Sequence, residues 1–179
     1  MIFTETPLAG AFLIELERAL DERGSFARVF DAEAWQSNGL NSQIVQCSVS
    51  FNTRRGTLRG MHYQADPWAE CKLVRCTRGA IYDVIIDLRP DSPTFTHWFG
   101  AELTETNDRL LYIPERFAHG FQTLEDATEV SYQISQIYVP EAARGVRWDD
   151  PAFAVEWPDA EDGRVISARD RAYPDFRRG

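Results

Sequence analysis

Short β-rich runs recur between residues 43 and 136, and this pattern constrains the fold more than any other feature of the chain. Turn signals such as Arg55-Gly56, Asp66-Pro67 and Arg78-Gly79 separate the runs, and no helical pattern lies between them. Close spacing of this kind is typical of an antiparallel sandwich or barrel. We therefore predict an all-β fold, with strands over residues 43–51, 57–63, 72–77, 80–88, 97–103, 109–113, 120–124 and 128–136.

The two ends of the chain show weaker patterns. Residues 12–16 fit either a short strand or the start of a helix. Residues 31–37 predict one or two helical turns, with Asp31 as the N-cap and Asn38-Gly39 as the stop. The proline-rich tail is expected to wrap the barrel in loops and short helices. Because no linker or internal repeat interrupts the chain, we predict one domain over residues 1–179.

Charge and cysteine content limit the possible partners. The chain carries 19 Lys+Arg against 28 Asp+Glu, a net charge of -9. This balance argues against nucleic acid or an anionic membrane surface, but a local cluster of cations can still bind a small anion. No run approaches 18 apolar residues, and the N-terminus lacks a signal-peptide pattern, so we expect a cytoplasmic protein. Cys47, Cys71 and Cys76 lack C-x-x-C spacing, which predicts neither a disulfide framework nor a zinc site.

The segment Arg-Gly-Met-His-Tyr-Gln at residues 59–64 is the strongest candidate for a functional strand. It precedes Lys72, the only lysine in a chain whose other basic residues are arginine. Strand alternation places His62 and Arg59 on opposite faces, but a bulge at Gly60 would let both side chains face one cavity. An ammonium offers a compact charge that arginine does not, so Lys72 is a candidate functional residue. The alternatives are a hydrogen-bonded core histidine and an ordinary solvated lysine.

Three further candidates lie toward the C-terminus. His119 follows a proline loop and is predicted at the start of a strand, at the mouth of the barrel. Tyr132 and Tyr138 bracket the end of the last long strand, where a phenol can act as an acid or simply pack. Residues 167–170, Ser-Ala-Arg-Asp, have the form of a capping box. Asp170 therefore either caps a short helix or orients a barrel histidine.

These residue types fit one reaction. An imidazole paired with a carboxylate is a base suited to neutral pH. An ammonium opposite that base can stabilise an enolate oxygen, and a tyrosine on the far side can return a proton. The set fits proton abstraction next to a carbonyl, with reprotonation on the opposite face.

Longer motifs follow one another in a specific order. They are Asp-Glu-Arg-Gly-Ser-Phe at 21–26, Leu-Arg-Gly-Met-His-Tyr-Gln at 58–64, Lys-Leu-Val-Arg-Cys at 72–76, Asp-Val-Ile-Ile-Asp-Leu-Arg at 83–89, Ser-Pro-Thr-Phe at 92–95, Phe-Ala-His-Gly-Phe at 117–121, Trp-Asp-Asp-Pro at 148–151, Glu-Trp-Pro at 156–158 and Ser-Ala-Arg-Asp at 167–170. In this order and at these spacings the chain resembles the dTDP-4-dehydrorhamnose 3,5-epimerase family of cupin-fold enzymes over nearly all of its length.

The resemblance implies a jelly-roll barrel that acts on a nucleotide-linked 4-keto-6-deoxy sugar without a metal or organic cofactor. His62 would match the base that removes protons from C3 and/or C5, and Asp170 would pair with it. Lys72 would match the residue that stabilises the enolate oxygen. Tyr132 would match the acid that reprotonates the opposite face.

The resemblance also implies a homodimer and a set of substrate contacts. An N-terminal segment of about residues 1–40 would pack on the partner subunit. The binding set would comprise Arg59 and His119 at the sugar and phosphates, Arg23 at the diphosphate across the dimer, Phe26 and Tyr138 near the base, and Gln46.

Departures from the family pattern concentrate near the predicted nucleotide base. Arg28 stands where the family usually has glutamate, and Cys47 and Ser48 stand where it has aspartate and asparagine. Arg116 replaces a usual glycine. The predicted catalytic set is unchanged, so these differences leave open the nucleotide, which is thymidine diphosphate or another such as CDP. They also leave open whether one or two centres are inverted.

Two other readings use the same barrel. A metal-dependent cupin enzyme would use His62 and His119 as ligands. However, Gln64 stands where a second histidine is expected, and Glu70 is the only nearby carboxylate, which makes a poor site for a transition metal. The other reading is a sugar ketoisomerase or a sugar-nucleotide-binding module. A binding module has no need to keep all the predicted catalytic residues together.

Overall fold

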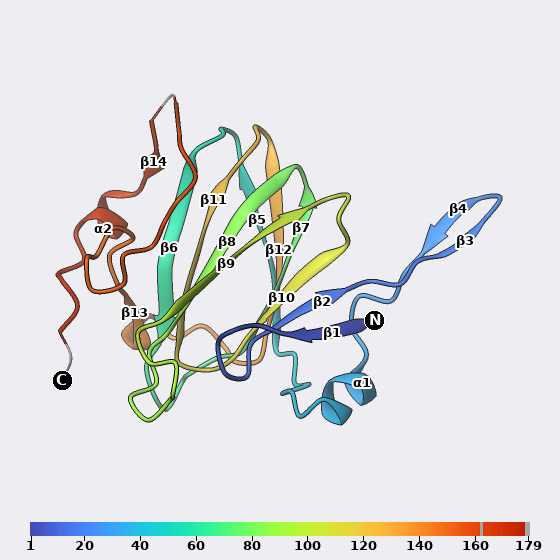
Figure 1. The fold of residues 1–179 in the computed structure, drawn as a ribbon, viewed down its shortest axis with the longest axis horizontal. Coiled ribbons are helices and arrows are strands. Elements are labelled where there is room, and N and C mark those ends of the chain that lie inside the picture. The colour runs from blue at the N-terminus through green and yellow to red at the C-terminus, as the bar shows by residue number, and fades with distance from the viewer. Residues whose placement is uncertain (162, 178–179) are drawn as a thin grey trace.

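Two six-stranded sheets face each other in the computed structural model, which describes residues 1–161 and 163–177 (Figure 1). The strands of the first sheet are, in spatial order, β1 (Ile2–Glu5), β2 (Phe12–Glu15), β10 (Arg109–Ile113), β7 (Lys72–Arg78), β12 (Thr128–Ile134) and β5 (Gln46–Asn52). The second sheet runs β13 (Ala143–Gly145), β6 (Thr57–Gln64), β11 (Phe117–Thr123), β8 (Ala80–Asp87) and β9 (Trp98–Thr104), and the short β14 (Val165–Ile166) also pairs with β6. Neighbouring strands are antiparallel, apart from β14 on β6. The predicted all-β, cupin-type jelly roll is confirmed.

Most predicted strands end within three residues of the observed ones. Residues 12–16 prove to belong to a strand, β2, which pairs with β1 and β10. Two strand starts differ by three residues: β5 begins at Gln46, later than the predicted residue 43, and β11 begins at Phe117, earlier than the predicted residue 120. Arg116 has φ 62°, and this left-handed turn brings Phe117 directly opposite Asp87 of β8. The prediction that His119 opens the strand at the barrel mouth is therefore wrong.

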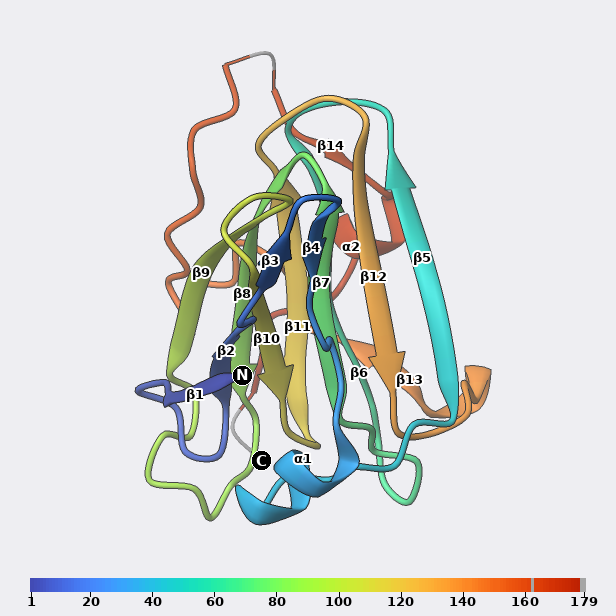
Figure 2. The same cartoon turned by 90° about the vertical axis from the view of Figure 1, so that its right-hand side faces the viewer.

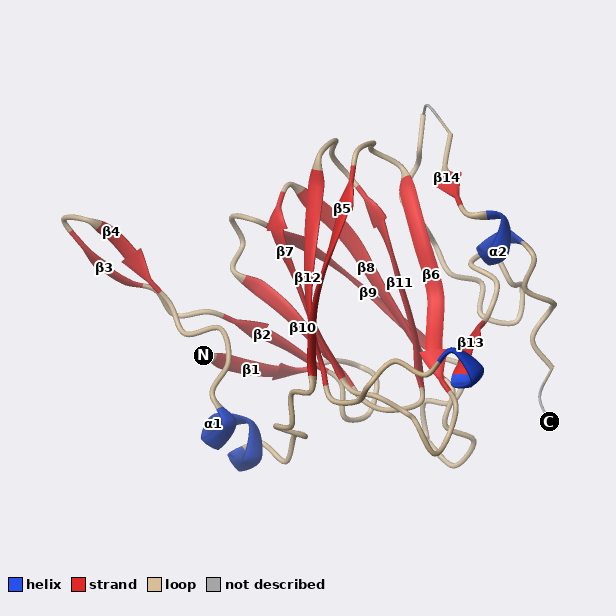
Figure 3. Ribbon diagram, turned by 180° about the vertical axis from the view of Figure 1, so that it is seen from behind, coloured by secondary structure: helices blue, strands red, loops and turns tan. Residues whose placement is uncertain are grey.

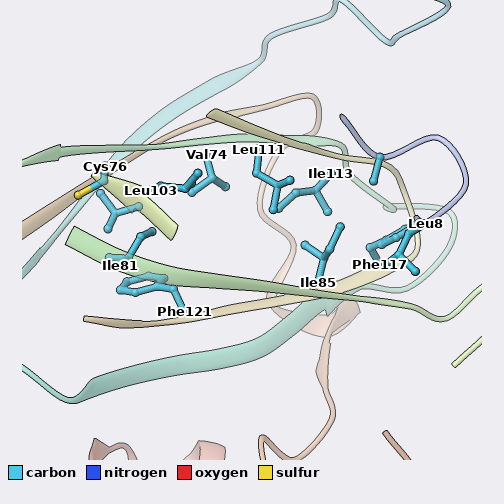
Figure 4. Close-up of a cluster of buried hydrophobic side chains, with 12 residues drawn as sticks. Leu8, Val74, Cys76, Ile81, Ile85, Leu103, Leu111, Ile113, Phe117 and Phe121 are labelled. Carbon is cyan, nitrogen blue, oxygen red and sulfur yellow. The ribbon is translucent and has the colours of Figure 1, made fainter. Parts of the chain in front are cut away.

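Alternation along the strands places one set of apolar side chains between the sheets (Figure 4). Val74 and Cys76 of β7 point inward, whereas Leu73 packs on the outer face of the first sheet. Ile81 and Ile85 of β8 approach them from the second sheet. The whole inner cluster comprises Leu8, Ala11, Val74, Cys76, Ile81, Ile85, Leu103, Leu111, Ile113, Phe117, Phe121 and Val130. This cluster runs along the length of β7, β8, β10 and β11, and polar side chains occupy inward positions toward β5, β6 and β12.

A short helix closes part of the outer face of the first sheet. Helix α1 (Ala32–Ser37) begins after Asp31, whose carboxylate accepts hydrogen bonds from the N–H groups of Glu33 and Ala34. This confirms the predicted helix and its N-cap. Trp35 is buried against the rings of Phe3 and Phe30. The helix thus packs on the barrel of its own chain.

Two peripheral segments differ in how much they contact the barrel. The hairpin of β3 (Ala19–Asp21) and β4 (Gly24–Phe26) projects away from it in Figure 1, and in Figure 2 the hairpin lies in front of the barrel, facing the viewer. Two large apolar side chains of this hairpin, Leu20 and Phe26, are exposed. By contrast, the C-terminal segment with η1 (Pro140–Ala142), β14 and α2 (Ala168–Arg171) lies along β6 (Figure 3). None of the helices in the described ranges is long and apolar enough to cross a membrane.

Candidate active site

The polar side of the barrel contains a cavity of about 700 Å³. Its walls come from β5, β6, β7, β11 and β12, and the segment of β14 and α2 forms its rim. Six residues predicted to act in catalysis or binding line it: Arg59, His62, Lys72, His119, Tyr132 and Asp170. The fold therefore brings together side chains that lie up to 111 positions apart in the chain, from Arg59 to Asp170.

A bulge in β6 lets Arg59 and His62 reach the same cavity. His62 lies opposite His119 of β11, but Arg59 lies opposite Phe121, so β6 contains one residue more than β11 between these pairs. Gly60 occupies the bulge with φ 130°, and a Cβ atom there would lie 2.5 Å from the Cα atom of Gly120. Only glycine fits this close approach of two strands. The predicted bulge is confirmed.

Asp170 orients His62. Its Oδ1 atom lies 2.7 Å from Nε2 of His62, and its Oδ2 atom accepts the N–H of Gly60 at 3.4 Å. Ser167 caps α2 by accepting the N–H of Asp170, which fixes the carboxylate at the helix start. Burial raises the pKa of Asp170, but the interactions with His62, together with hydrogen bonds to Gly60 and Ser167, lower that pKa by more, so the carboxylate stays ionised. Asp170 is therefore the orienting partner of a histidine, rather than a simple cap.

His62 and His119 differ in their access to the cavity. The His62 side chain is 42% exposed, whereas that of His119 is only 5% exposed. The Nε2 atom of His119 lies 2.6 Å from Oδ1 of Asp83, which is fully buried. Burial raises the pKa of Asp83 despite the nearby charge of His119. His62 is thus the imidazole that can reach a bound molecule, and His119 is held within the wall.

Tyr132 faces the cavity from the first sheet. Its ring centroid lies 6.1 Å from that of His119. Burial raises the pKa of the Tyr132 phenol above its usual value, and the carboxylate of Asp83 raises it further. The phenol therefore stays protonated at neutral pH and can donate a proton. Lys72 lines the same cavity, with its Nζ atom 3.3 Å from the carbonyl oxygen of His62.

A second cavity of about 220 Å³ adjoins the first and shares His62, Lys72 and Arg169 with it. Gln46 and Tyr138, both predicted substrate contacts, line this second cavity. The Gln46 side chain accepts a hydrogen bond from the N–H of Tyr138 at 2.7 Å. The two residues are thus brought together beside the catalytic candidates.

Arg23 and Phe26 do not reach either cavity of their own chain. Both lie on the projecting hairpin, where Phe26 is 73% exposed and Arg23 forms an ion pair with Asp21. Among the departures from the family pattern, Ser48 lines the large cavity, whereas Arg28 pairs with Asp31.

Sequence reasoning missed three polar residues of the site: Glu70, Asp83 and Arg169. Asp83 had a usable signal, because it occupies an inward position between Ile81 and Ile85, and the other residues from Ala80 to Ile86 are hydrophobic. Arg169 lines both cavities and stands beside Asp170 in the capping motif. Glu70 lies two residues before Lys72 and was considered only as a possible metal ligand.

The described residues also lack the kind of donor set that a metal ion requires. The described residues contain no group of three or more His, Cys, Asp or Glu side chains placed to hold an ion. Instead, His62 and His119 are each hydrogen-bonded to a carboxylate of their own.

Comparison with known proteins identifies the family. The sequence profile of dTDP-4-dehydrorhamnose 3,5-epimerase matches residues 5–178. The chain belongs to this epimerase family. It is 43% identical, over 98% of its length and 94% of the relative's, to the dTDP-4-dehydrorhamnose 3,5-epimerase of Methanothermobacter thermautotrophicus. The predicted family membership and the predicted isomerase class are both confirmed.

Solved structures of the epimerase family share the fold closely. The Bacillus anthracis dTDP-4-dehydrorhamnose 3,5-epimerase, solved with TDP and pyrophosphate bound, superposes with a TM-score of 0.93 at 39% identity, covering 98% of this chain and 99% of that one. The Streptomyces bikiniensis 3'-monoepimerase ChmJ, solved with dTDP-quinovose, gives a TM-score of 0.87 at 30% identity, covering 95% and 85%. The epimerase family thus includes a protein described as acting at one centre.

Proposed function

We propose that this chain epimerises C3 and/or C5 of a nucleotide-linked 4-keto-6-deoxy sugar through an enolate. One observation carries the proposal: an oriented histidine, an ammonium and a protonated phenol line a single cavity. This is the set that proton abstraction next to a carbonyl and reprotonation from the opposite side require.

In the proposed mechanism, each residue acts at a different atom. His62, oriented by Asp170, removes the proton from the carbon next to the keto group. Lys72 donates an N–H to the oxygen that gains negative charge, which stabilises the enolate. Tyr132 then gives its proton to the other face of the carbon, and the configuration is inverted.

Two arginines of the large cavity suit the diphosphate. Arg59 and Arg169 both line the large cavity, and a guanidinium binds phosphate oxygens through paired N–H groups. The Nε atom of Arg59 already donates to Asn52 at 2.7 Å, which holds the side chain in place. We propose that His119 supports the sugar from within the wall.

The nucleotide is proposed to be thymidine diphosphate, because the family relatives are named for dTDP sugars and one holds TDP. The base would lie in the smaller cavity, against Tyr138 and Gln46. The differences at Arg28, Cys47 and Ser48 make CDP the alternative to test. Michaelis constants for dTDP-, CDP- and GDP-linked 4-keto sugars will separate them, and a preference for the cytidine form would contradict thymidine recognition.

We also propose a homodimer in which the β3–β4 hairpin reaches the partner's cavity. Leu20 is 78% exposed on this hairpin, which is the part of residues 1–40 that projects from the barrel. Arg23 and Phe26 would then contact the diphosphate and the base across the interface. Light scattering of the wild type and of Phe26→Asp tests this, since a monomeric wild type would rule it out. The cytoplasmic location stays a prediction.

The reaction itself is tested by solvent exchange. The enzyme is incubated with dTDP-4-keto-6-deoxyglucose in heavy water, and deuterium at C3 and C5 is followed by mass spectrometry and proton NMR. Exchange at both carbons indicates a 3,5-epimerase, and exchange at one indicates a mono-epimerase. Exchange with neither the dTDP- nor the CDP-linked sugar would overturn the proposed function.

A further inference from the structure

Lys72 forms an ion pair that the proposed reaction does not use. Its Nζ atom lies 3.0 Å from Oε1 of Glu70. Both side chains are largely buried, with 12% of the lysine and 6% of the glutamate exposed. Taking two charges out of water costs free energy that a single ion pair rarely recovers. The Glu70–Lys72 pair is therefore poorly explained as a device for stability alone.

The second oxygen of Glu70 supports this conclusion. Oε2 is buried and has no hydrogen-bond partner within the described part of the chain. Asp87, a buried acid in a structural network, shows the contrast: Arg89 binds both of its oxygens, and Ser92 and Thr94 add further bonds. A carboxylate that serves packing is satisfied in this way, whereas Glu70 uses only the oxygen that faces Lys72.

The two contacts of Lys72 leave part of its ammonium free for a bound molecule. An ammonium carries three N–H groups. Oε1 of Glu70 lies 3.0 Å from the Nζ atom as its ion-pair partner, and the carbonyl oxygen of His62 accepts an N–H at 3.3 Å. The side chain lines both cavities, so these two contacts direct the free part of the ammonium.

We propose that Glu70 is a positioning residue that fixes the ammonium of Lys72 so that its free N–H points at the substrate's keto oxygen. This inference rests on the role proposed above for Lys72. The ammonium also donates to the backbone carbonyl of His62, the residue whose imidazole is the proposed base. Glu70 thereby sets the distance between the group that removes the proton and the group that receives the developing charge.

Three substitutions at Glu70 separate position from charge and packing. Glu70→Met keeps the length of the side chain without an acceptor. Glu70→Asp keeps the charge but withdraws the oxygens by one methylene. Glu70→Gln keeps an acceptor at the same place without the charge. The control is Glu15→Gln, because Glu15 pairs with Arg109 at the same 3.0 Å distance on the surface, with 40% of the glutamate side chain exposed.

The kinetic expectation follows from geometry. Displacing a catalytic group by about 1 Å costs on the order of 100-fold in rate. Glu70→Met and Glu70→Asp should therefore lower kcat by about 10- to 100-fold, with KM for the sugar nucleotide within about twofold of wild type. Glu70→Gln should restore kcat to within about fivefold, because a neutral acceptor still holds the N–H. Glu15→Gln should leave both constants unchanged.

The single lysine allows a direct spectroscopic test. Protein labelled with ¹³C at lysine Cε shows one signal, from Lys72. A side chain held in one rotamer keeps its two ε-protons distinct, and free rotation averages them. We expect distinct protons in wild type, Glu70→Gln and Glu15→Gln, and averaged protons in Glu70→Met. If Glu70→Met does not fold, Glu70→Asp carries the same expectation.

The outcomes distinguish this inference from the proposed function. An active wild type with unchanged kcat in Glu70→Asp, or with an unchanged lysine signal, would overturn the positioning role alone. A wild type that exchanges no deuterium would overturn both.

Discussion

The Nε2 atom of His62 lies 2.7 Å from the Oδ1 atom of Asp170, although 108 residues separate them in the chain. The contact exists because the C-terminal segment returns to β6, where β14 pairs with Thr57 and Leu58 and α2 begins beside Gly60. The tail therefore does more than cover the barrel. It delivers the carboxylate that fixes the ring of the candidate base.

Asp170→Asn should abolish most of the exchange activity. Asparagine carries no negative charge, and its NH₂ group can take the place of the accepting oxygen. The imidazole of His62 therefore loses both its orientation and its electrostatic support. General-base catalysis contributes about 100- to 10,000-fold, and we expect a loss of kcat in this range. Deuterium incorporation at C3 and C5 measures it.

Asp150→Asn is the matched control for Asp170→Asn. Asp150 is also a buried acid of the tail that accepts backbone N–H groups, from Ala152 and Phe176, but it does not contact a histidine. A similar loss of exchange in both variants, at equal thermal stability, would contradict a specific role for Asp170.

Tyr132→Phe should separate proton removal from inversion. His62 remains able to remove the substrate proton and to return a deuteron to the same face, while the acid on the opposite face is missing. We expect deuterium exchange to continue while formation of the epimer falls by about 100-fold or more. Proton NMR of the product reports both quantities in one sample. Tyr82→Phe serves as control, because Tyr82 of β8 packs against Trp157, away from the cavity. An equal loss of exchange and inversion in Tyr132→Phe would refute the assignment.

Gly60→Ala tests the close approach of β6 and β11. The new Cβ would lie 2.5 Å from Cα of Gly120, so the two strands must separate and His62 must move. Gly24→Ala is a close control, because Gly24 has φ 131°, nearly the same as Gly60, but no atom within 4 Å of the added Cβ. Urea denaturation should show a loss for Gly60→Ala that exceeds that of Gly24→Ala by about 1–3 kcal/mol. Equal losses would mean that backbone strain, rather than the strand contact, sets the cost.

Local patterns in the sequence were sufficient for much of the fold. Alternation and turn residues located the strands, and the glycine at position 60 indicated the bulge that brings Arg59 to the side of His62. Helix α1 was predicted because its N-cap, Asp31, acts within four residues. Signals of this range depend only on neighbours in the chain.

The polar interior could not be predicted in the same way. Glu70 lies in the loop just before β7 and looks like a surface acid in the sequence, and only its burial shows that it faces Lys72. Asp83 stands out at an inward position, but no local pattern predicts its contact with His119, 36 residues away. The prediction put His119 at the barrel mouth because it extended the proline loop to residue 119, whereas β11 already begins at Phe117. The pairing of Asp170 with His62 came from the family resemblance, since nothing local specifies a contact across the whole barrel.

Asp87→Asn should destabilise the fold in a way that depends on pH. Burial raises the pKa of Asp87, but the hydrogen bonds from Arg89, Ser92 and Thr94 lower it by more, so the folded-state pKa lies below the ordinary value. A lowered folded-state pKa stabilises the protein above the unfolded-state pKa of about 4, and this contribution disappears as the pH falls through the folded-state value. We expect a loss of about 2–4 kcal/mol near pH 7 that shrinks steadily toward about pH 3. Urea denaturation at both pH values measures it.

Asp91→Asn is the control, because Asp91 is an exposed acid of the same loop. It should change stability by less than about 0.5 kcal/mol at either pH. A loss for Asp87→Asn that stays constant with pH would show that the ionised carboxylate is not what stabilises the loop.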